Sequence, residues 1–228
     1  MYDVTTKLEG LTIDLLSDTH CQHNKLVMPG GDILIHAGDM TYRGTIKEII
    51  PFLEWFEAQK YRHKILVAGN HDWLFETVPA ICKEECERRG IILLNDSGVE
   101  IERIKIWGSP VQPEFCDWAF NRKRGEQIKA HWDMIPNDTE LLITHGPPKG
   151  FLDATQHGEQ VGCDDLWHKI LETQVKLHVF GHIHEGRGYK YFMDRLFVNA
   201  SAVDRMYRMV TGEPIRVIKG IDGSYLVE

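Results

Sequence analysis

Residues 64–72 read KILVAGNHD, a strand-like apolar run that leads directly into glycine, asparagine, histidine and aspartate. A short apolar run bounded by turn residues is typical of a strand buried in a parallel sheet. Asn70 and His71 therefore follow the carboxyl end of a predicted strand, which is where open α/β sheets bind their ligands. The stretch predicts an α/β fold with a site at one edge of its sheet.

Four further apolar runs end in side chains that bind metals: Asp18-Thr-His20, Gly38-Asp39, His145-Gly146 and Gly181-His182-Ile-His184. Each motif alone is weak evidence, but an accidental occurrence of all five on five strand ends is improbable. They supply seven candidate ligands, enough for two metal ions: Asp18, His20, Asp39, Asn70, His145, His182 and His184. The mixture of carboxylate, amide and imidazole donors favours Mn²⁺, with Fe or Zn²⁺ as alternatives, over Mg²⁺ and Ca²⁺, which prefer shells of oxygen alone.

The rest of the chain alternates strand-like and helical patterns in its first half, which predicts parallel βαβ units. The second half is richer in strands. The predicted strands are 11–16, 32–36, 64–68, 91–94, 100–102, 105–107, 141–144, 177–180, 196–199 and 215–218. The predicted helices are 45–59, 78–89, 125–134 and 163–172, the first opened by the capping box Thr45-Ile-Lys-Glu48.

The composition fits one soluble domain over residues 1–228. A chain of 228 residues with 43% hydrophobic side chains can form one sizeable core. The net charge of −8 argues against a basic groove, so no stable nucleic-acid partner is expected. We expect no leader, no membrane association and a reduced, cytoplasmic location, because no run approaches the roughly 18 apolar residues of a span and the five cysteines are scattered. The oligomeric state stays open.

The order D-x-H, G-D, G-N-H-D, H-G and G-H-x-H resembles the calcineurin-like metallophosphoesterase superfamily. Segments such as GDILIHAGDMT, LLITHGPPKGF and VNAS are most similar to its MPPED (metallophosphoesterase-domain-containing) branch. The resemblance implies a four-layer α/β/β/α sandwich of two mixed sheets, with two divalent metal ions at the carboxyl ends of the strands. It assigns Asp18, His20 and His184 to one metal, Asn70, His145 and His182 to the other, and Asp39 to a bridge between them.

The reaction implied by the resemblance is hydrolysis of small phosphodiesters, with 2′,3′- or 3′,5′-cyclic nucleotides as the expected substrates. A metal-bridging hydroxide would attack phosphorus, because two metals lower the pKa of a shared water toward about 7. His71 lies outside the ligand set and is the expected proton donor to the leaving oxygen. The alternatives are a phosphomonoesterase or a nuclease on the same site, or a binding scaffold, which the complete ligand set disfavours.

Two further assignments concern the surroundings of His71. Many relatives read G-D-x-x-D-R, and the second aspartate orients the catalytic histidine; here that place holds Tyr42. Asp72 is therefore the candidate for orienting His71. Asn70 and His71 are also expected to contact the substrate, as are Trp118 and Asn121 from the long loop 108–124, for which loop packing is the alternative.

Overall fold

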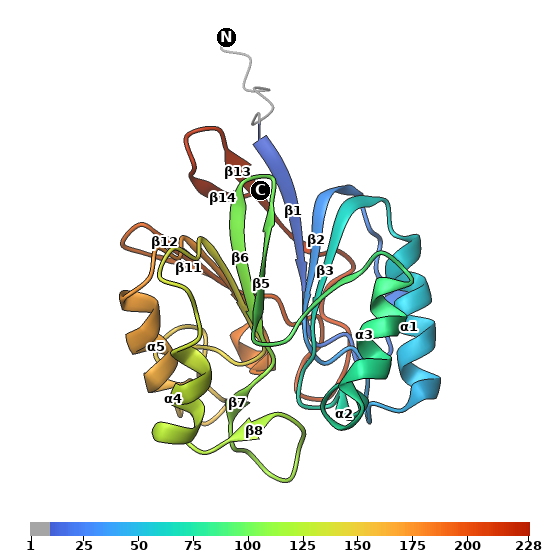
Figure 1. Cartoon of the computed structure of the whole chain (residues 1–228), viewed down its shortest axis with the longest axis horizontal. Coiled ribbons are helices and arrows are strands. Elements are labelled where there is room, and N and C mark those ends of the chain that lie inside the picture. The colour runs from blue at the N-terminus through green and yellow to red at the C-terminus, as the bar shows by residue number, and fades with distance from the viewer. Residues whose placement is uncertain (1–9) are drawn as a thin grey trace.

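Two six-stranded sheets pack face to face within residues 10–228, the part of the chain that this computed structural model describes (Figure 1). Residues 1–9, on which the expectation about a leader partly rests, lie outside this range. Helices cover the outer faces of both sheets (Figure 1). They are α1 (Ile46–Ala58), α2 (Trp73–Thr77) and α3 (Pro79–Glu87) on one side, and α4 (Glu126–Trp132) and α5 (Asp164–Leu171) on the other. The expected four-layer α/β/β/α sandwich is confirmed.

The first sheet combines parallel strands with an antiparallel edge. Its order is β14-β13-β1-β2-β3-β4, in which β1 to β4 run parallel and β13 runs antiparallel to both of its neighbours. Its strands are β1 (Gly10–Leu16), β2 (Gly31–Ala37), β3 (Tyr61–Val67), β4 (Ile92–Leu94), β13 (Ile215–Gly220) and β14 (Tyr225–Val227).

The second sheet has the order β11-β12-β10-β9-β6-β5, with four parallel central strands and an antiparallel strand at each edge. Its strands are β5 (Ser97–Ile101), β6 (Ile104–Ser109), β9 (Leu141–Thr144), β10 (Leu177–Phe180), β11 (Gly188–Phe192) and β12 (Arg195–Asn199). A short parallel pair, β7 (Gln112–Pro113) and β8 (Asn121–Arg122), closes the long loop that follows β6.

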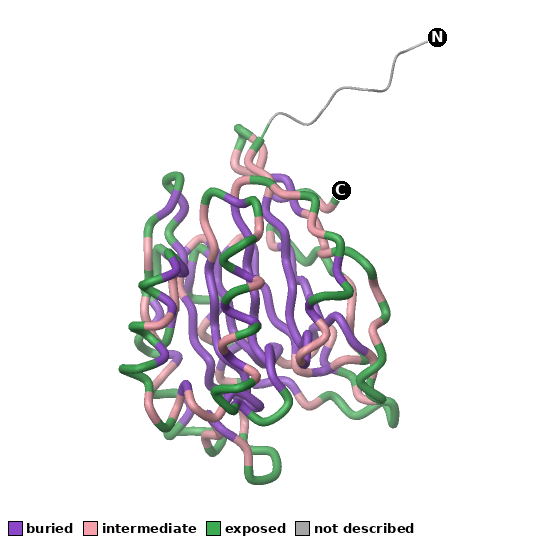
Figure 2. The backbone as a smooth tube through the Cα atoms, turned by 90° about the vertical axis from the view of Figure 1, so that its right-hand side faces the viewer, coloured by how far each residue is buried: buried purple, intermediate pink, exposed green. Residues whose placement is uncertain are grey.

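Alternate side chains of the central strands face different apolar layers, because successive residues of a strand point to opposite faces. In β2, Ile33 and Ile35 pack in the core between the sheets, while Leu34 packs against the helices. In β9, Leu141 faces the core between the sheets and Leu142 faces α4 and α5. The central strands are accordingly the most continuously buried part of the backbone (Figure 2).

The predicted helices form close to their expected bounds. α1 begins after the capping box of Thr45 and Glu48, as predicted. Among residues 10–228, no helix combines the length and the apolar character needed to cross a bilayer.

The carboxyl ends of the parallel strands of both sheets meet at one end of the sandwich, the lower end in Figure 1, where α2, β7 and β8 lie. Main-chain hydrogen bonds join the loops of the two sheets there. Ser17, after β1, donates to the carbonyl of Ala200 at 3.0 Å. Ala202, after β12, donates to the carbonyl of Ser17 at 2.8 Å. The strand ends of both sheets are thereby held in one cluster.

Candidate metal centre

The side chains expected to bind metal converge at the carboxyl ends of five parallel strands. Asp18, Asp39 and Asn70 follow β1, β2 and β3. His145 and His182 follow β9 and β10 of the second sheet. Ligand atoms lie within 4.8 Å of one another in three groups, which are Asp18, His20 and His184; His20, Asp39 and His71; and Asp39, His145 and His182. Both sheets therefore contribute to a single centre.

Main-chain carbonyl groups orient four of the histidines. Each ring donates from Nδ1 at 2.8 to 3.0 Å, in the pairs His20–Thr41, His71–Tyr42, His145–Ala37 and His184–Asp204. Because a carbonyl oxygen only accepts, the Nδ1 atom carries a proton and Nε2 faces the site. Nε2 of His20 is buried and has no hydrogen-bond partner among the described residues, as expected for an atom that binds a metal ion.

The Asp39 carboxylate lies at the middle of the centre. Its Oδ2 atom is 3.4 Å from Nε2 of His145 and 3.8 Å from Nε2 of His20. Asp18 serves the other side, with Oδ1 3.3 Å from Nε2 of His184 and 4.0 Å from Nε2 of His20. Asp39 therefore faces donors of both groups, as a ligand shared by two ions must.

The glycines of the motifs make room for the ligands. A Cβ atom on Gly69 would overlap Oδ1 of Asp39 and lie 2.7 Å from Cε1 of His145. A Cβ atom on Gly181 would overlap Oδ2 of Asp18. Any larger residue at these two positions would displace a candidate ligand.

Several ligands have a backbone conformation that L-residues rarely adopt. The φ angles of Asp18, His20, Asp39 and His182 are 52°, 38°, 57° and 67°. Left-handed backbone outside glycine costs on the order of 1–3 kcal/mol per residue and concentrates at functional sites. The surrounding hydrogen bonds hold these four residues in place against that cost.

The ionisation states of the side chains in the centre favour binding of a metal cation. Burial lowers the pKa of His20 to about 4 and that of His182 to about 3, so both rings are neutral at neutral pH and ready to bind metal. Burial also disfavours a charged His145, yet the Asp39 carboxylate raises its pKa to about 9. Burial opposes ionisation of Asp18 and Asp39, but the histidines around them lower the pKa of both carboxyl groups below its usual range. An ion that binds His145 would displace its proton.

Two buried residues support the ligands from behind, and sequence reasoning did not predict their partners. Ser201 donates its hydroxyl to Oδ2 of Asp18 at 2.8 Å. The buried ring of His178 lies 2.8 Å from Oγ1 of Thr144, the residue directly before His145. The VNAS segment contains Ser201, so a signal existed, but nothing in the sequence indicates its partner.

The structure corrects the role expected for Asp72, whose carboxylate does not orient His71. It accepts hydrogen bonds from the main-chain N–H groups of Asp39 at 2.9 Å and Thr41 at 3.1 Å. Burial and the charge of Asp39 raise the pKa of Asp72 to about 6. Asp72 therefore shapes the loop that carries Asp39, and the carbonyl of Tyr42 orients the ring of His71.

The two loop residues expected at the substrate differ in their surroundings. Trp118 is partly exposed and stacks on the ring of His71, with centroids 4.1 Å apart. The amide of Asn121 is bonded within the loop, as in the alternative of loop packing. Its Oδ1 accepts from Nε2 of Gln112 at 3.1 Å, and its Nδ2 donates to the carbonyl of Cys116 at 2.9 Å. These bonds commit the Asn121 amide to holding the loop together.

A cavity of about 440 Å³ opens beside the centre. His182 and His184 form part of its wall, and Phe115, Tyr207 and Arg205 provide aromatic and cationic surface. This volume lies within the range of roughly 300–1,000 Å³ found for small-molecule sites.

Residues 11–186 match the family model for calcineurin-like phosphoesterases. The human and mouse proteins named metallophosphoesterase domain-containing protein 1 are each 38% identical over 218 residues, which covers 86% of this chain and 67% of theirs. The crystal structure of phosphopantetheinyl hydrolase from Mycobacterium tuberculosis has a similar fold, with a TM-score of 0.61 and 17% identity over 87% of this chain and 91% of that one. Family members use a dimetal site, and the Asp and His groups described above are suited to one. The chain therefore belongs to the calcineurin-like phosphoesterase family of hydrolases, in the metallophosphoesterase-domain-containing branch that its motifs indicate.

Proposed function

We propose that the protein is a metal-dependent phosphodiesterase that hydrolyses small phosphodiesters, with 2′,3′- or 3′,5′-cyclic nucleotides as substrates. The observation that carries the proposal is the position of Asp39 between two groups of histidine Nε2 atoms, beside a cavity of nucleotide size. The family relationship supports phosphoester hydrolysis.

The donor set fits two divalent ions, for which we propose Mn²⁺. Asp18, His20 and His184 would hold the first ion, Asn70, His145 and His182 the second, and Asp39 both. When bound, the ions would supply Lewis-acid activation of a phosphoryl oxygen and of a water nucleophile. Two divalent charges exceed the two ligand carboxylates by about +2, so an anionic phosphodiester would be attracted although the whole chain carries −8.

His71 is the proposed proton donor to the leaving oxygen. Its Nδ1 is bound by the Tyr42 carbonyl, and its Nε2 lies 3.9 Å from Oδ2 of Asp39, facing the site. Its side chain is 11% exposed, so a bound substrate would reach it. The same position would allow His71 to bind a metal ion or to stabilise phosphoryl charge instead, and metal analysis of a variant separates the first of these roles from proton donation.

The cavity and the charge support the proposed substrate class. Phe115 and Tyr207 offer aromatic surface on which a base could stack, and Trp118 stacks on the ring of His71. The cavity is suited to a mononucleotide, and the net charge of −8 argues against binding of a long nucleic acid.

The experiment is a substrate panel with the purified chain reconstituted with Mn²⁺. It compares bis(p-nitrophenyl) phosphate, p-nitrophenyl phosphate, and 2′,3′- and 3′,5′-cyclic AMP, each with and without a chelator. We expect faster hydrolysis of the diesters than of the monoester, and loss of activity with the chelator. A reconstituted protein that binds metal and cleaves only the monoester would contradict the diesterase assignment. A reconstituted protein that cleaves none of the esters would contradict the proposal that it hydrolyses phosphate esters of this kind.

A further inference from the structure

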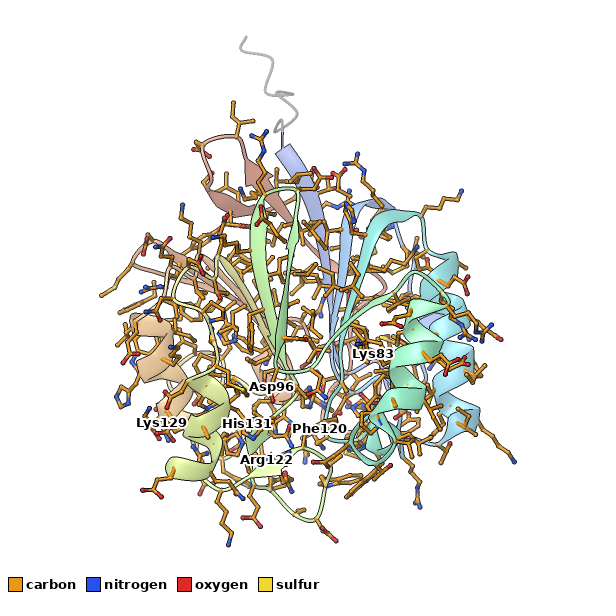
Figure 3. All side chains as sticks on the ribbon, viewed as in Figure 1. Lys83, Asp96, Phe120, Arg122, Lys129 and His131 are labelled. Carbon is orange, nitrogen blue, oxygen red and sulfur yellow. The ribbon has the colours of Figure 1, made fainter. Side chains whose placement is uncertain are left out.

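A chain of hydrogen-bonded polar side chains runs behind the loop of residues 110–124, outside the metal centre. Figure 3 shows three of its members, Asp96, His131 and Arg122, grouped beside α4 at the lower end of the molecule. His131 lies 2.7 Å from Asp96 (Nδ1 to Oδ2) and 3.1 Å from Nε of Arg122 (at Nε2). Nη1 of Arg122 donates to Oε1 of Glu76 at 3.0 Å. This polar chain of hydrogen bonds thus connects the turn after β4 with α4, β8 and α2.

The chemistry of the groups determines the direction of each bond. An arginine N–H only donates, so Nε2 of His131 accepts and its Nδ1 carries the proton. Asp96 accepts a hydrogen bond from Nδ1 of His131 and a second one from the hydroxyl of Ser109 at 2.6 Å. The side chains of His131 and Asp96 are only 22% and 17% exposed, so water competes weakly for these bonds. A neutral group with one donor and one acceptor is required between Arg122 and Asp96.

The far end of this polar chain holds the part of the loop that lies against Asn70 and His71. Oε2 of Glu76 accepts the main-chain N–H of Phe120 at 2.7 Å. The preceding residue, Ala119, donates its N–H to the carbonyl oxygen of Asn70 at 3.1 Å. One residue earlier, Trp118 stacks on the ring of the proposed proton donor. The polar chain therefore ends on the segment that touches two residues of the centre.

We propose that His131 is a positioning residue for phosphoester hydrolysis, which keeps Trp118 against His71 by linking Arg122 to Asp96. The inference rests on the proposed function, because it gives the loop a task in the reaction. His131 acts through Arg122 and the loop. Its loss leaves the Nε–H of Arg122 without its acceptor and removes the link from the loop to Asp96, which frees the loop to move away from His71. A misplacement of about 1 Å at a distant position can cost on the order of 100-fold in rate.

The kinetic test uses substitutions that separate hydrogen bonding from packing. His131→Leu removes both bonds at similar volume, whereas His131→Gln keeps one donor and one acceptor on the same amide. With Mn²⁺ and bis(p-nitrophenyl) phosphate, we expect His131→Leu to lower kcat/KM by about tenfold or more, and His131→Gln to retain most of it. The control is Lys129→Ala on the same helix, which removes only an exposed pair with Asp133 and should leave kcat/KM unchanged. Equal rates for His131→Leu and wild type would overturn the proposal.

A double-mutant cycle distinguishes positioning from general stabilisation. If His131 acts through Trp118, the loss caused by His131→Leu should largely disappear in a Trp118→Ala background, because the two changes then remove one shared effect. If the double variant instead loses kcat/KM by the product of the two single-variant factors, the proposal is overturned. If His131→Leu does not fold, Arg122→Met breaks the same link from its other side and enters the cycle in its place.

Hydrogen exchange measured by mass spectrometry gives a readout independent of activity. The amides of residues 112–122 should exchange faster in His131→Leu than in wild type, and at the wild-type rate in His131→Gln and Lys129→Ala. Unchanged exchange in His131→Leu would overturn the proposal. If wild type cleaves none of the esters, the proposed function fails, while the exchange rates still decide whether His131 holds the loop.

Discussion

The imidazole of His71 lies against the indole of Trp118, with ring centroids 4.1 Å apart and planes inclined by 28°. This stack and the bond from Nδ1 to the carbonyl of Tyr42 fix the ring on two sides. The residue at position 42 thus orients the histidine through its main chain, where relatives with a second aspartate are expected to use a side chain. The centre can therefore lack that aspartate and keep the histidine in place.

Replacing His71 tests the division between ligand and proton donor. His71→Ala should keep both metal ions, because its Nε2 is not in the ligand set, and should lower kcat by roughly 10²–10⁴-fold, the usual contribution of general acid catalysis. Elemental analysis after reconstitution measures the metal, and hydrolysis of bis(p-nitrophenyl) phosphate measures kcat. Loss of one equivalent of metal would show that His71 is a ligand instead.

Glycine 69 provides a steric test of the centre. Gly69→Ala should lose metal and activity, because the new Cβ atom would overlap Oδ1 of Asp39 and crowd Cε1 of His145. The matched control is Gly212→Ala, where a Cβ atom meets nothing within 4 Å and the backbone φ is ordinary. Metal content by elemental analysis and kcat/KM are compared for both variants. Full metal binding in Gly69→Ala would show that Asp39 and His145 do not need their present positions.

Asp72 is predicted to be essential for a reason other than catalysis. Asp72→Ala removes the acceptor of several buried main-chain N–H groups, including those of Asp39 and Thr41, so we expect a loss of about 3 kcal/mol or more in the free energy of unfolding. Metal binding should fall with it, because the loop that carries Asp39 loses its support. Urea unfolding and metal analysis check both effects. A stable variant with normal metal content and low kcat would restore a direct catalytic role.

The strands that the sequence predicts best are those buried on both faces. The bounds of β9 and β10 agree with the predicted 141–144 and 177–180, because continuous apolar runs mark them. β11 was not predicted. It is an edge strand whose residues are almost all exposed, so no continuous apolar run marks it, and its pairing with β12 appears only in three dimensions.

The site shows the same division. The convergence of Asp18, Asp39 and Asn70 was predictable, because each follows a parallel strand and such ends share one edge of a sheet. The role of Asp72 was not, because most of its partners are main-chain amides, those of residues 39–41 and of Gly69, which any sequence would supply. A side-chain pattern can indicate which residues gather, but it carries little information about bonds to the backbone.

The buried ring of His178 predicts how stability depends on pH. The hydroxyl of Thr144 donates to the carbonyl of Gly146 at 2.7 Å, so Nε2 of His178 must donate to Oγ1 of Thr144 and Nδ1 carries no proton. Nδ1 is buried without a partner among the described residues, and burial lowers the pKa of His178 to about 3.

The sign of the effect follows from proton uptake. Below about pH 6.5 the unfolded chain protonates His178, whereas the folded chain does so only near pH 3. The free energy of unfolding should therefore fall as the pH falls from about 6.5, and His178 should account for about 1.4 kcal/mol per pH unit of that slope. His178→Gln retains an N–H donor for Thr144 but does not titrate. The slope of its unfolding free energy against pH should therefore be smaller than that of wild type by the contribution of one proton. Urea unfolding of metal-free wild type and variant at pH 7, 6 and 5 measures the two slopes; equal slopes would mean that His178 takes up its proton in the folded state as readily as in the unfolded one.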